Sequence, residues 1–449
     1  MRFLFFTLFC AVSLLADMSI EEAWRSLESK NSGLEASKKD YEAAKLKRES
    51  AKSMYLPSIS LSANYTHLDK PIDFDTSKIA ALVDAIPLSL PPFPSTMDLS
   101  KEDIFLADLQ LLWPLYTGGK IDAAQEIYSA KIDESKAMLG MKKDKEFLKL
   151  IKYYYGVVLA ETYYKTTQEA VKALKLHYEN AKKMQQQGQI AKVELLNAQV
   201  KLDAAKIEND KAADNVSITK KALALLSGLD EDPSSKLFVY RVKKEMEYYE
   251  RELVQNSATL ALLDAKEKQS KSFIKVQKAD FYPEVLGYGD YNLYRDDSPL
   301  MQSLPNWFAG IIVKINLLER KDRAQEISIA RLQNAKVKAL KKEAVDNLKI
   351  LLQKSYEEML SSLKEYKALD SSLALAKENY RLRSLSFEEG LATSSDVVDA
   401  ELFLQSVETK RLNAAYNFVT KLSHLSVLSG EREKFFEIAK MADIEVLEK

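Results

Sequence analysis

The sequence contains one unit that occurs twice, and this constrains its fold more than any other feature. The two halves share a tripeptide and two glycines in the same order: Ala124-Gln125-Glu126 with Ala324-Gln325-Glu326, Gly188 with Gly390, and Gly228 with Gly430. The spacing is 200 residues for the tripeptide and 202 for both glycines. Spacings that stay this nearly equal over the length of each half indicate an internal duplication.

Each half contains two segments in which apolar and polar residues alternate. The predicted strands cover residues 54–67 and 104–115 in the first half and residues 280–294 and 306–316 in the second. Alternation of period two over about ten residues is typical of strands, and this length suits outer-membrane barrels. The apolar face carries aromatic residues of the types enriched where lipid meets water: Tyr65, Trp113, Tyr291 and Trp307.

The rest of the sequence predicts long helices. The chain has only 12 Gly and 11 Pro in 449 residues, which favours few turns. The predicted long and return helices cover residues 120–187 and 191–227 in the first half and residues 319–386 and 394–429 in the second. A further helix opens each half, and the first of these is predicted near 19–52. Helices of this length have no compact core of their own, so their apolar seams must pack against other helices.

The first residues predict export. Residues 1–16 combine Arg2 with an apolar run that ends at Ala16, which is typical of a secretory signal peptide. Its removal leaves a chain without cysteine, because Cys10 is the single one. No later segment approaches 18 uncharged apolar residues, so we expect no transmembrane helix. If the exported chain spans a membrane, it must do so with β-strands.

Composition argues against several other functions. The 65 Lys and Arg balance 66 Asp and Glu, so the chain lacks the excess positive charge that binding to nucleic acid requires. His67, His177 and His424 are isolated from one another, and no Ser/His/Asp, Cys/His or clustered-acid spacing suggests catalysis. We therefore expect no enzyme activity, no metal site and no cofactor.

The number of strands predicts an oligomer. Four strands cannot close a barrel, and an open edge in lipid leaves backbone groups unpaired. Two copies would supply eight strands, and side chains nearly fill the interior of an eight-stranded barrel. Three copies would supply twelve strands, and a barrel of that size leaves room for a lumen. We therefore expect a homotrimer.

The order of elements resembles the TolC family of outer-membrane efflux proteins over essentially the whole mature chain. Three stretches carry the likeness: the strand-to-helix segment from Trp113 to Lys120, Gly188 with residues 193–198, and Gly390 with residues 396–400. The second copy departs from the family pattern, because Leu318-Glu319 stands where Gly118-Gly119 would be repeated.

The resemblance implies a mixed α and β fold. A trimeric 12-stranded transmembrane β-barrel, with four strands per chain, would continue into a long antiparallel coiled-coil α-helical barrel. This places the protein in the Gram-negative outer membrane, in contact with its lipid and with a periplasmic extension. The expected domains are a signal peptide (1–16), a first repeat (17–228, with a loop at 68–103), an equatorial linker (229–250), a second repeat (251–430) and a C-terminal equatorial segment (431–449).

The resemblance also implies a function and partners. The chain would be the passive exit duct of a tripartite efflux or type I secretion system, together with a periplasmic adaptor (a membrane fusion protein) and an inner-membrane transporter. Drugs, metal ions and proteins stay open as substrates, with small molecules favoured as the commonest use in the family. The alternative is a periplasmic coiled-coil scaffold without a pore, although a scaffold has no use for a lipid-facing sheet.

Two aspartates are the candidate gate. Asp396 and Asp399 are three residues apart and share a helix face. In the family, aspartates at the matching positions point into the lumen and narrow the closed periplasmic entrance. The alternative is helix capping by Thr393, Ser394 or Ser395 with an acid in the first turn, which explains Asp396 but not Asp399.

The helix tips are the other candidate site. Gly188 and Gly390 are expected at tight turns that need a positive φ. Because the family meets its adaptor at these tips, both glycines and the nearby Glu194 are candidate adaptor contacts.

Overall fold

The structure is a computed structural model that describes residues 17–86, 91–241, 244–317 and 320–444. The predicted signal peptide (1–16) and Leu318-Glu319 lie outside the described residues. The chain divides into two compact units: the first takes Met1–Tyr41, Glu134–Asp264 and Ala339–Lys449, and the second takes Glu42–Asp133 and Ala265–Lys338. Each unit therefore combines corresponding segments of both repeats.

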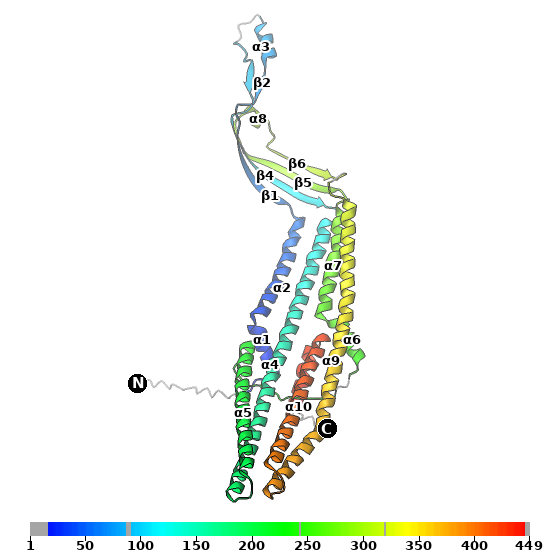
Figure 1. The fold of residues 1–449 in the computed structure, drawn as a ribbon. Helices are drawn as coiled ribbons and strands as arrows, with labels where there is room; N and C mark the ends of the chain where they lie inside the picture. Colours follow the sequence, from blue (N-terminus) through cyan, green and yellow to red (C-terminus); the bar gives the residue numbers. More distant parts are fainter. Residues whose placement is uncertain (1–16, 87–90, 242–243, 318–319, 445–449) are drawn as a thin grey trace, which may run out of the picture. The chain divides into compact units, whose positions relative to one another are not determined.

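The second unit contains a four-stranded antiparallel sheet in the order β1-β4-β5-β6 (Figure 1). Its strands are β1 (Ser58–His67), β4 (Asp103–Tyr116), β5 (Glu284–Arg295) and β6 (Trp307–Lys314). The prediction of four strands from the alternating segments is confirmed. The pairing of β4 with β5 joins the first repeat to the second.

The register gives the sheet one apolar face. A row that crosses all four strands on this face consists of Leu61, Leu109, Tyr291 and Trp307. The next row, on the opposite face, consists of Ser60, Gln110, Asp290 and Phe308. Large apolar side chains on the first face remain exposed, as Leu61 (68%) and Trp307 (65%) show. Within the sheet, β1 and β6 each pair with one neighbour only.

The segment predicted as a loop, residues 68–103, is more ordered than expected. It contains a two-stranded sheet of β2 (Asp73–Asp75) and β3 (Thr96–Asp98), with α3 (Ser77–Asp84) between them. The side chain of Thr76, which follows β2, donates a hydrogen bond to the carbonyl of Pro94, which precedes β3. This bond links the two ends of the segment that connects these strands. The shorter connection between β5 and β6 contains only α8 (Pro299–Gln302).

The helices of the first repeat are α1 (Ile20–Lys30), α2 (Ser32–Ala51), α4 (Lys120–Gln186) and α5 (Lys192–Ser227), with a 3-10 turn at Lys52–Tyr55. Figure 1 shows α5 running back along α4. The start of the chain adjoins the end of α5, because the Ser26 hydroxyl donates to the Ser227 carbonyl at 2.7 Å. The predicted helix near 19–52 is broken at Asn31, whose side chain accepts the amide hydrogen of Leu34 at 2.9 Å.

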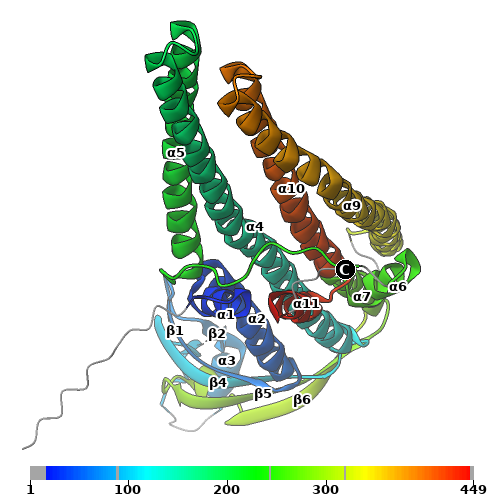
Figure 2. The same cartoon turned by 90° about the horizontal axis from the view of Figure 1, so that it is seen from below.

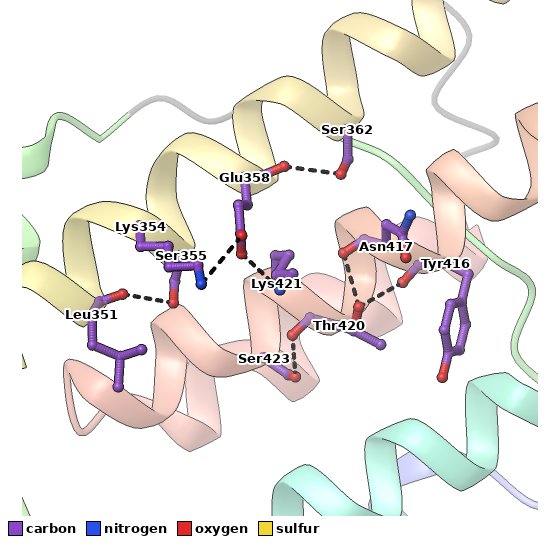
Figure 3. A network of polar contacts seen from close by, with 10 residues as sticks. All are labelled: Leu351, Lys354, Ser355, Glu358, Ser362, Tyr416, Asn417, Thr420, Lys421 and Ser423. Carbon is purple, nitrogen blue, oxygen red and sulfur yellow. Dashed lines mark hydrogen bonds and ion pairs between the residues drawn. The ribbon is translucent and has the colours of Figure 1, made fainter.

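The helices of the second repeat are α6 (Met246–Asn256), α7 (Ala258–Ala279), α9 (Arg323–Glu388) and α10 (Ser394–Leu428). An ion pair between Lys421 and Glu358, 2.7 Å long, joins α10 to α9 (Figure 3). The buried hydroxyl groups nearby, such as that of Ser423, donate hydrogen bonds to carbonyl oxygens of their own helix. They therefore keep a hydrogen-bond partner although the helices pack closely around them. Among the described residues, no helix combines the length and the apolar character needed to cross a membrane.

An aromatic cluster forms the core of the first unit. Phe147 of α4 packs edge-on against Trp24 of α1 and against Phe435 and Phe436 of α11 (Arg432–Ile444), with ring centroids 5.5–5.6 Å apart. Figure 2 shows α11 beside α1. The Tyr154 hydroxyl also donates to the Met18 carbonyl at 2.8 Å. Both ends of the described chain are therefore fastened to α4.

Candidate functional site

The two helical hairpins of the first unit turn in the same way. Gly188 follows α4 and Gly390 follows α9, and both have a φ of +73°. The residue after each glycine donates its amide hydrogen to a carbonyl five residues back: Gln189 to Met184 at 2.9 Å, and Leu391 to Ser386 at 2.8 Å. This is the Schellman geometry, in which a left-handed glycine ends a helix.

Asp396 lies in the first turn of α10 and caps that helix. Its Oδ2 accepts from the Thr393 amide at 2.8 Å and from the Thr393 hydroxyl at 2.7 Å, and the Thr393 side chain in turn accepts from the Asp396 amide. These bonds form a capping box. They lower the pKa of Asp396, and the more distant charge of Arg383 adds to the effect. The carboxylate is therefore held ionised at the start of the helix.

The remaining oxygen of Asp396 and the carboxylate of Asp399 are left for other contacts. Asp396 Oδ1 is 3.7 Å from the guanidinium of Arg383 on α9. Asp399 is exposed, and it takes part in no hydrogen bond or ion pair within the described parts of the chain. The capping alternative therefore accounts for Asp396, whereas Asp399 has no hydrogen-bonded or ionic partner among the residues that the structure describes.

Three polar residues join the two hairpins at their tips, and we call them the tip clasp: Glu194, Ser394 and His177. Oε2 of Glu194 on α5 accepts the amide hydrogen of Ser394, the first residue of α10, at 3.0 Å. His177 Nε2 on α4 lies 2.7 Å from the Ser394 hydroxyl oxygen. The first hairpin therefore caps the helix that carries Asp396 and Asp399.

Two of the three residues of the tip clasp are buried, and Glu194 is half-buried. Ser394 is fully buried and His177 is 5% exposed. The His177 ring packs edge-on against Phe387, with centroids 4.6 Å apart. Burial lowers the pKa of His177 to about 4, so the imidazole is neutral at physiological pH. Beside the tip clasp, Val397 packs with Ala181 and Ala198 of the first hairpin.

The sequence predicts an isolated histidine at His177 and does not predict the contact of Ser394 with the first hairpin. A signal for His177 was present, because Leu174 and Ala181, three residues before and four after it, are also buried. This spacing puts the histidine in the apolar seam of α4. No comparable signal marked Ser394, whose partner lies 200 residues away.

We expect Glu194→Ala to loosen the tip of the second hairpin. The change removes the only acceptor that the structure gives to the buried Ser394 amide, at a cost of about 1.5–3 kcal/mol for a bond to a charged group. Hydrogen exchange at residues 393–398 should accelerate by about tenfold or more. Glu194→Gln keeps an acceptor oxygen and serves as the control. Equal exchange in the alanine variant and the unmodified protein would contradict a role for this bond.

Comparison with known families follows the same two repeats. The profile of the family described as "Outer membrane efflux protein" matches residues 24–229 and 251–431. The two matched segments contain the four strands of the large sheet and both helical hairpins. No curated protein matches the chain in sequence.

Solved structures share the fold at low sequence identity. CusC superposes with a TM-score of 0.76 at 13% identity, covering 92% of each chain. The outer membrane protein VceC of Vibrio cholerae gives 0.74 at 14% identity, over 92% of this chain and 96% of VceC. The CmeC outer membrane channel of Campylobacter jejuni gives 0.74 at 14% identity, over 97% of this chain and 91% of CmeC.

Proposed function

The chain belongs to the outer membrane efflux protein family, and we propose that it is the exit duct of a tripartite efflux or secretion system. The family consists of outer-membrane channels, not of enzymes, so the protein is an outer-membrane efflux channel with a periplasmic extension. The TolC resemblance predicted this family, and the prediction is confirmed. The scaffold alternative is set aside, because such a protein would not form a channel.

The proposal is supported by an apolar-faced sheet in which, among the described residues, no further strand pairs with the outer edge of β1 or of β6. Unpaired backbone groups are costly in lipid, so β1 and β6 must find partners. Because four antiparallel strands alternate in direction, β6 of one copy can pair antiparallel with β1 of the next. Three copies would close a barrel of twelve strands. Its apolar face would point toward the lipid, and its polar face would line a lumen.

The helical hairpins supply the proposed gate. In a trimer, Asp396 and Asp399 would each form a ring of three carboxylates at the periplasmic entrance, where they would attract cations and repel one another. The tip clasp would hold the α10 end of each chain in the closed arrangement. For that task, Glu194 and Ser394 supply a direct hydrogen bond between the two hairpins.

Planar-bilayer recording tests the channel itself. The purified mature protein, added to one side of the bilayer, should give discrete conductance steps of uniform size. Removing strands β5 and β6 by deletion of residues 284–314 should abolish them, because two strands per chain cannot complete the wall. Steps of the same size from the deletion variant would contradict the proposed barrel.

The tripartite role requires partners, which we propose are a periplasmic adaptor and an inner-membrane transporter. The turns at Gly188 and Gly390, with the adjacent Glu194, are the proposed docking points for the adaptor. Crosslinking in cells followed by purification of the protein should recover one exported, helix-rich adaptor together with one transporter. Recovery of neither, under conditions in which the channel is inserted, would contradict the tripartite role.

A further inference from the structure

An acidic side chain is buried in the apolar seam of α10. Glu401 is only 5% exposed, and it follows the buried residues Val397, Val398 and Ala400 along the same helix. Glutamate is rarely buried to this extent without a partner. Its Oε2 has no hydrogen-bond partner and is shielded from solvent. Glu401 is therefore a buried polar group that the packing leaves unsatisfied.

Glu401 lines a cavity of about 550 Å³ between α4, α9 and α10, inside the first unit. This volume is far above the space one water molecule needs, so the cavity can hydrate. The titratable and charged side chains that line it are Lys165 and Glu169 from α4, Tyr366, Lys377 and Tyr380 from α9, and Glu408 and Arg411 from α10. Among these, the charge that acts on Glu401 is that of Glu408, which has the same sign.

Burial is the main reason that the pKa of Glu401 rises to about 7, and the charge of Glu408 adds to it. Burial also raises the pKa of Glu408, which lines the same cavity. The pKa of His177 falls to about 4 through burial, and burial raises the pKa of Tyr380 above its usual value of 10.0. Glu401 is thus a carboxyl group at this interface whose pKa lies near neutral pH.

We propose that Glu401 is a proton-binding site that controls how tightly the α9–α10 hairpin packs on α4. With its proton, the side chain is neutral and can stay packed in the apolar seam of α10. Without it, an unpaired carboxylate remains in an apolar seam, which is costly unless water or a cation enters the cavity. Loss of the proton therefore favours a loosened hairpin.

The direction of the pH effect follows from linkage. The pKa of Glu401 in the packed state lies above its ordinary value of 4.5, so protons bind more strongly to the packed hairpin than to the loosened one. The stabilisation is complete below a pH of about 4.5 and is lost as the pH rises through about 7. The consequence for the entrance rests on the proposed gate, because Asp396 lies five residues before Glu401 on α10. The proton site itself does not depend on that proposal.

Hydrogen exchange of the full mature protein in detergent tests the proposal. After correction for intrinsic rates, amides of residues 397–405 should exchange at least about tenfold faster at a pH of about 8.5 than at about 5.5, with a midpoint near 7. Glu401→Gln mimics the protonated side chain and should exchange slowly at both pH values. Glu169→Gln removes an exposed carboxylate from the same cavity and should keep the full response.

Several results would overturn the proposal: no pH response in the unmodified protein, looser packing at acid pH, or an undiminished response in Glu401→Gln. The unmodified protein alone decides the first two, so the proposal stays testable even if the variant folds poorly. Bilayer conductance, measured on the same samples, separates the two proposals. Absence of any channel would refute the duct, while the exchange data would still decide whether Glu401 binds the proton.

Discussion

Replacing Asp396 and Asp399 together by alanine is expected to raise the single-channel conductance by roughly threefold or more and to weaken block by divalent cations. In the proposed trimer, each substitution removes a ring of three like charges from the narrowest part of the entrance. A charge pair about 4 Å apart is worth on the order of 1 kcal/mol in water. Losing several carboxylates should therefore reduce the affinity of the blocking ion by at least about tenfold.

The capping box requires a control for this experiment. Asp396→Ala also removes the cap on α10, which costs about 1 kcal/mol. Thr393→Ala removes the same cap but keeps both carboxylates, so it should fray the helix while preserving divalent block. Asp399→Asn has no cap to lose and should weaken block by itself. Unchanged conductance and block in the double variant would refute the assignment of the gate.

Gly118→Ala is expected to destabilise the protein by roughly 3 kcal/mol or more, which is the largest effect on folding that we predict for one residue. Gly118 lies in the turn from β4 to α4 with a φ of +63°. A Cβ atom there would lie 2.8 Å from the Ala279 carbonyl oxygen and 2.8 Å from Tyr282 Cβ. Left-handed strain of about 1–2 kcal/mol therefore adds to overpacking of about 1–3 kcal/mol.

Gly119→Ala is the matched control. Gly119 has a φ of +81°, but nothing lies within 4 Å of a Cβ built there. Gly119→Ala should be destabilised only by the backbone strain of its positive φ. The difference in unfolding free energy between the two variants therefore measures the cost of the close contact with Ala279 and Tyr282. Urea unfolding in detergent, followed by circular dichroism, measures both free energies of unfolding. Equal values would contradict the close contact.

The sheet could be predicted from the sequence because the information for a strand is local. Alternating residues between Pro57 and Thr66 indicate a strand with one apolar face, and the register places those residues accordingly. The break at Asn31 was missed for the opposite reason. Asn31 sits in a helix-favouring stretch, and only its side-chain bond to the Leu34 amide shows that a new helix begins there. Such capping competes with helix continuation and depends on small differences in energy.

The candidate site likewise combines features that local sequence predicts with contacts between distant segments that it does not. The turn glycines and the paired aspartates of α10 are patterns within a few residues, so the sequence displayed them. The tip clasp depends on Glu194 meeting Ser394, and no pattern within one helix reveals a contact between hairpins so far apart in the chain. Glu401 shows a third case: its place after Val397 and Val398 can be read from the sequence, but only the packing of α4 and α9 shows that its Oε2 has no hydrogen-bond partner.

In the proposed duct, one chain cannot complete the membrane wall and must share it with other copies. Native mass spectrometry of the protein extracted from outer membranes counts the chains directly. We predict a complex of three chains, stable in detergent and without a detectable population of free single chains. A single chain that stays folded and soluble in buffer without detergent would contradict the account, because the exposed face and both sheet edges would then need no partner.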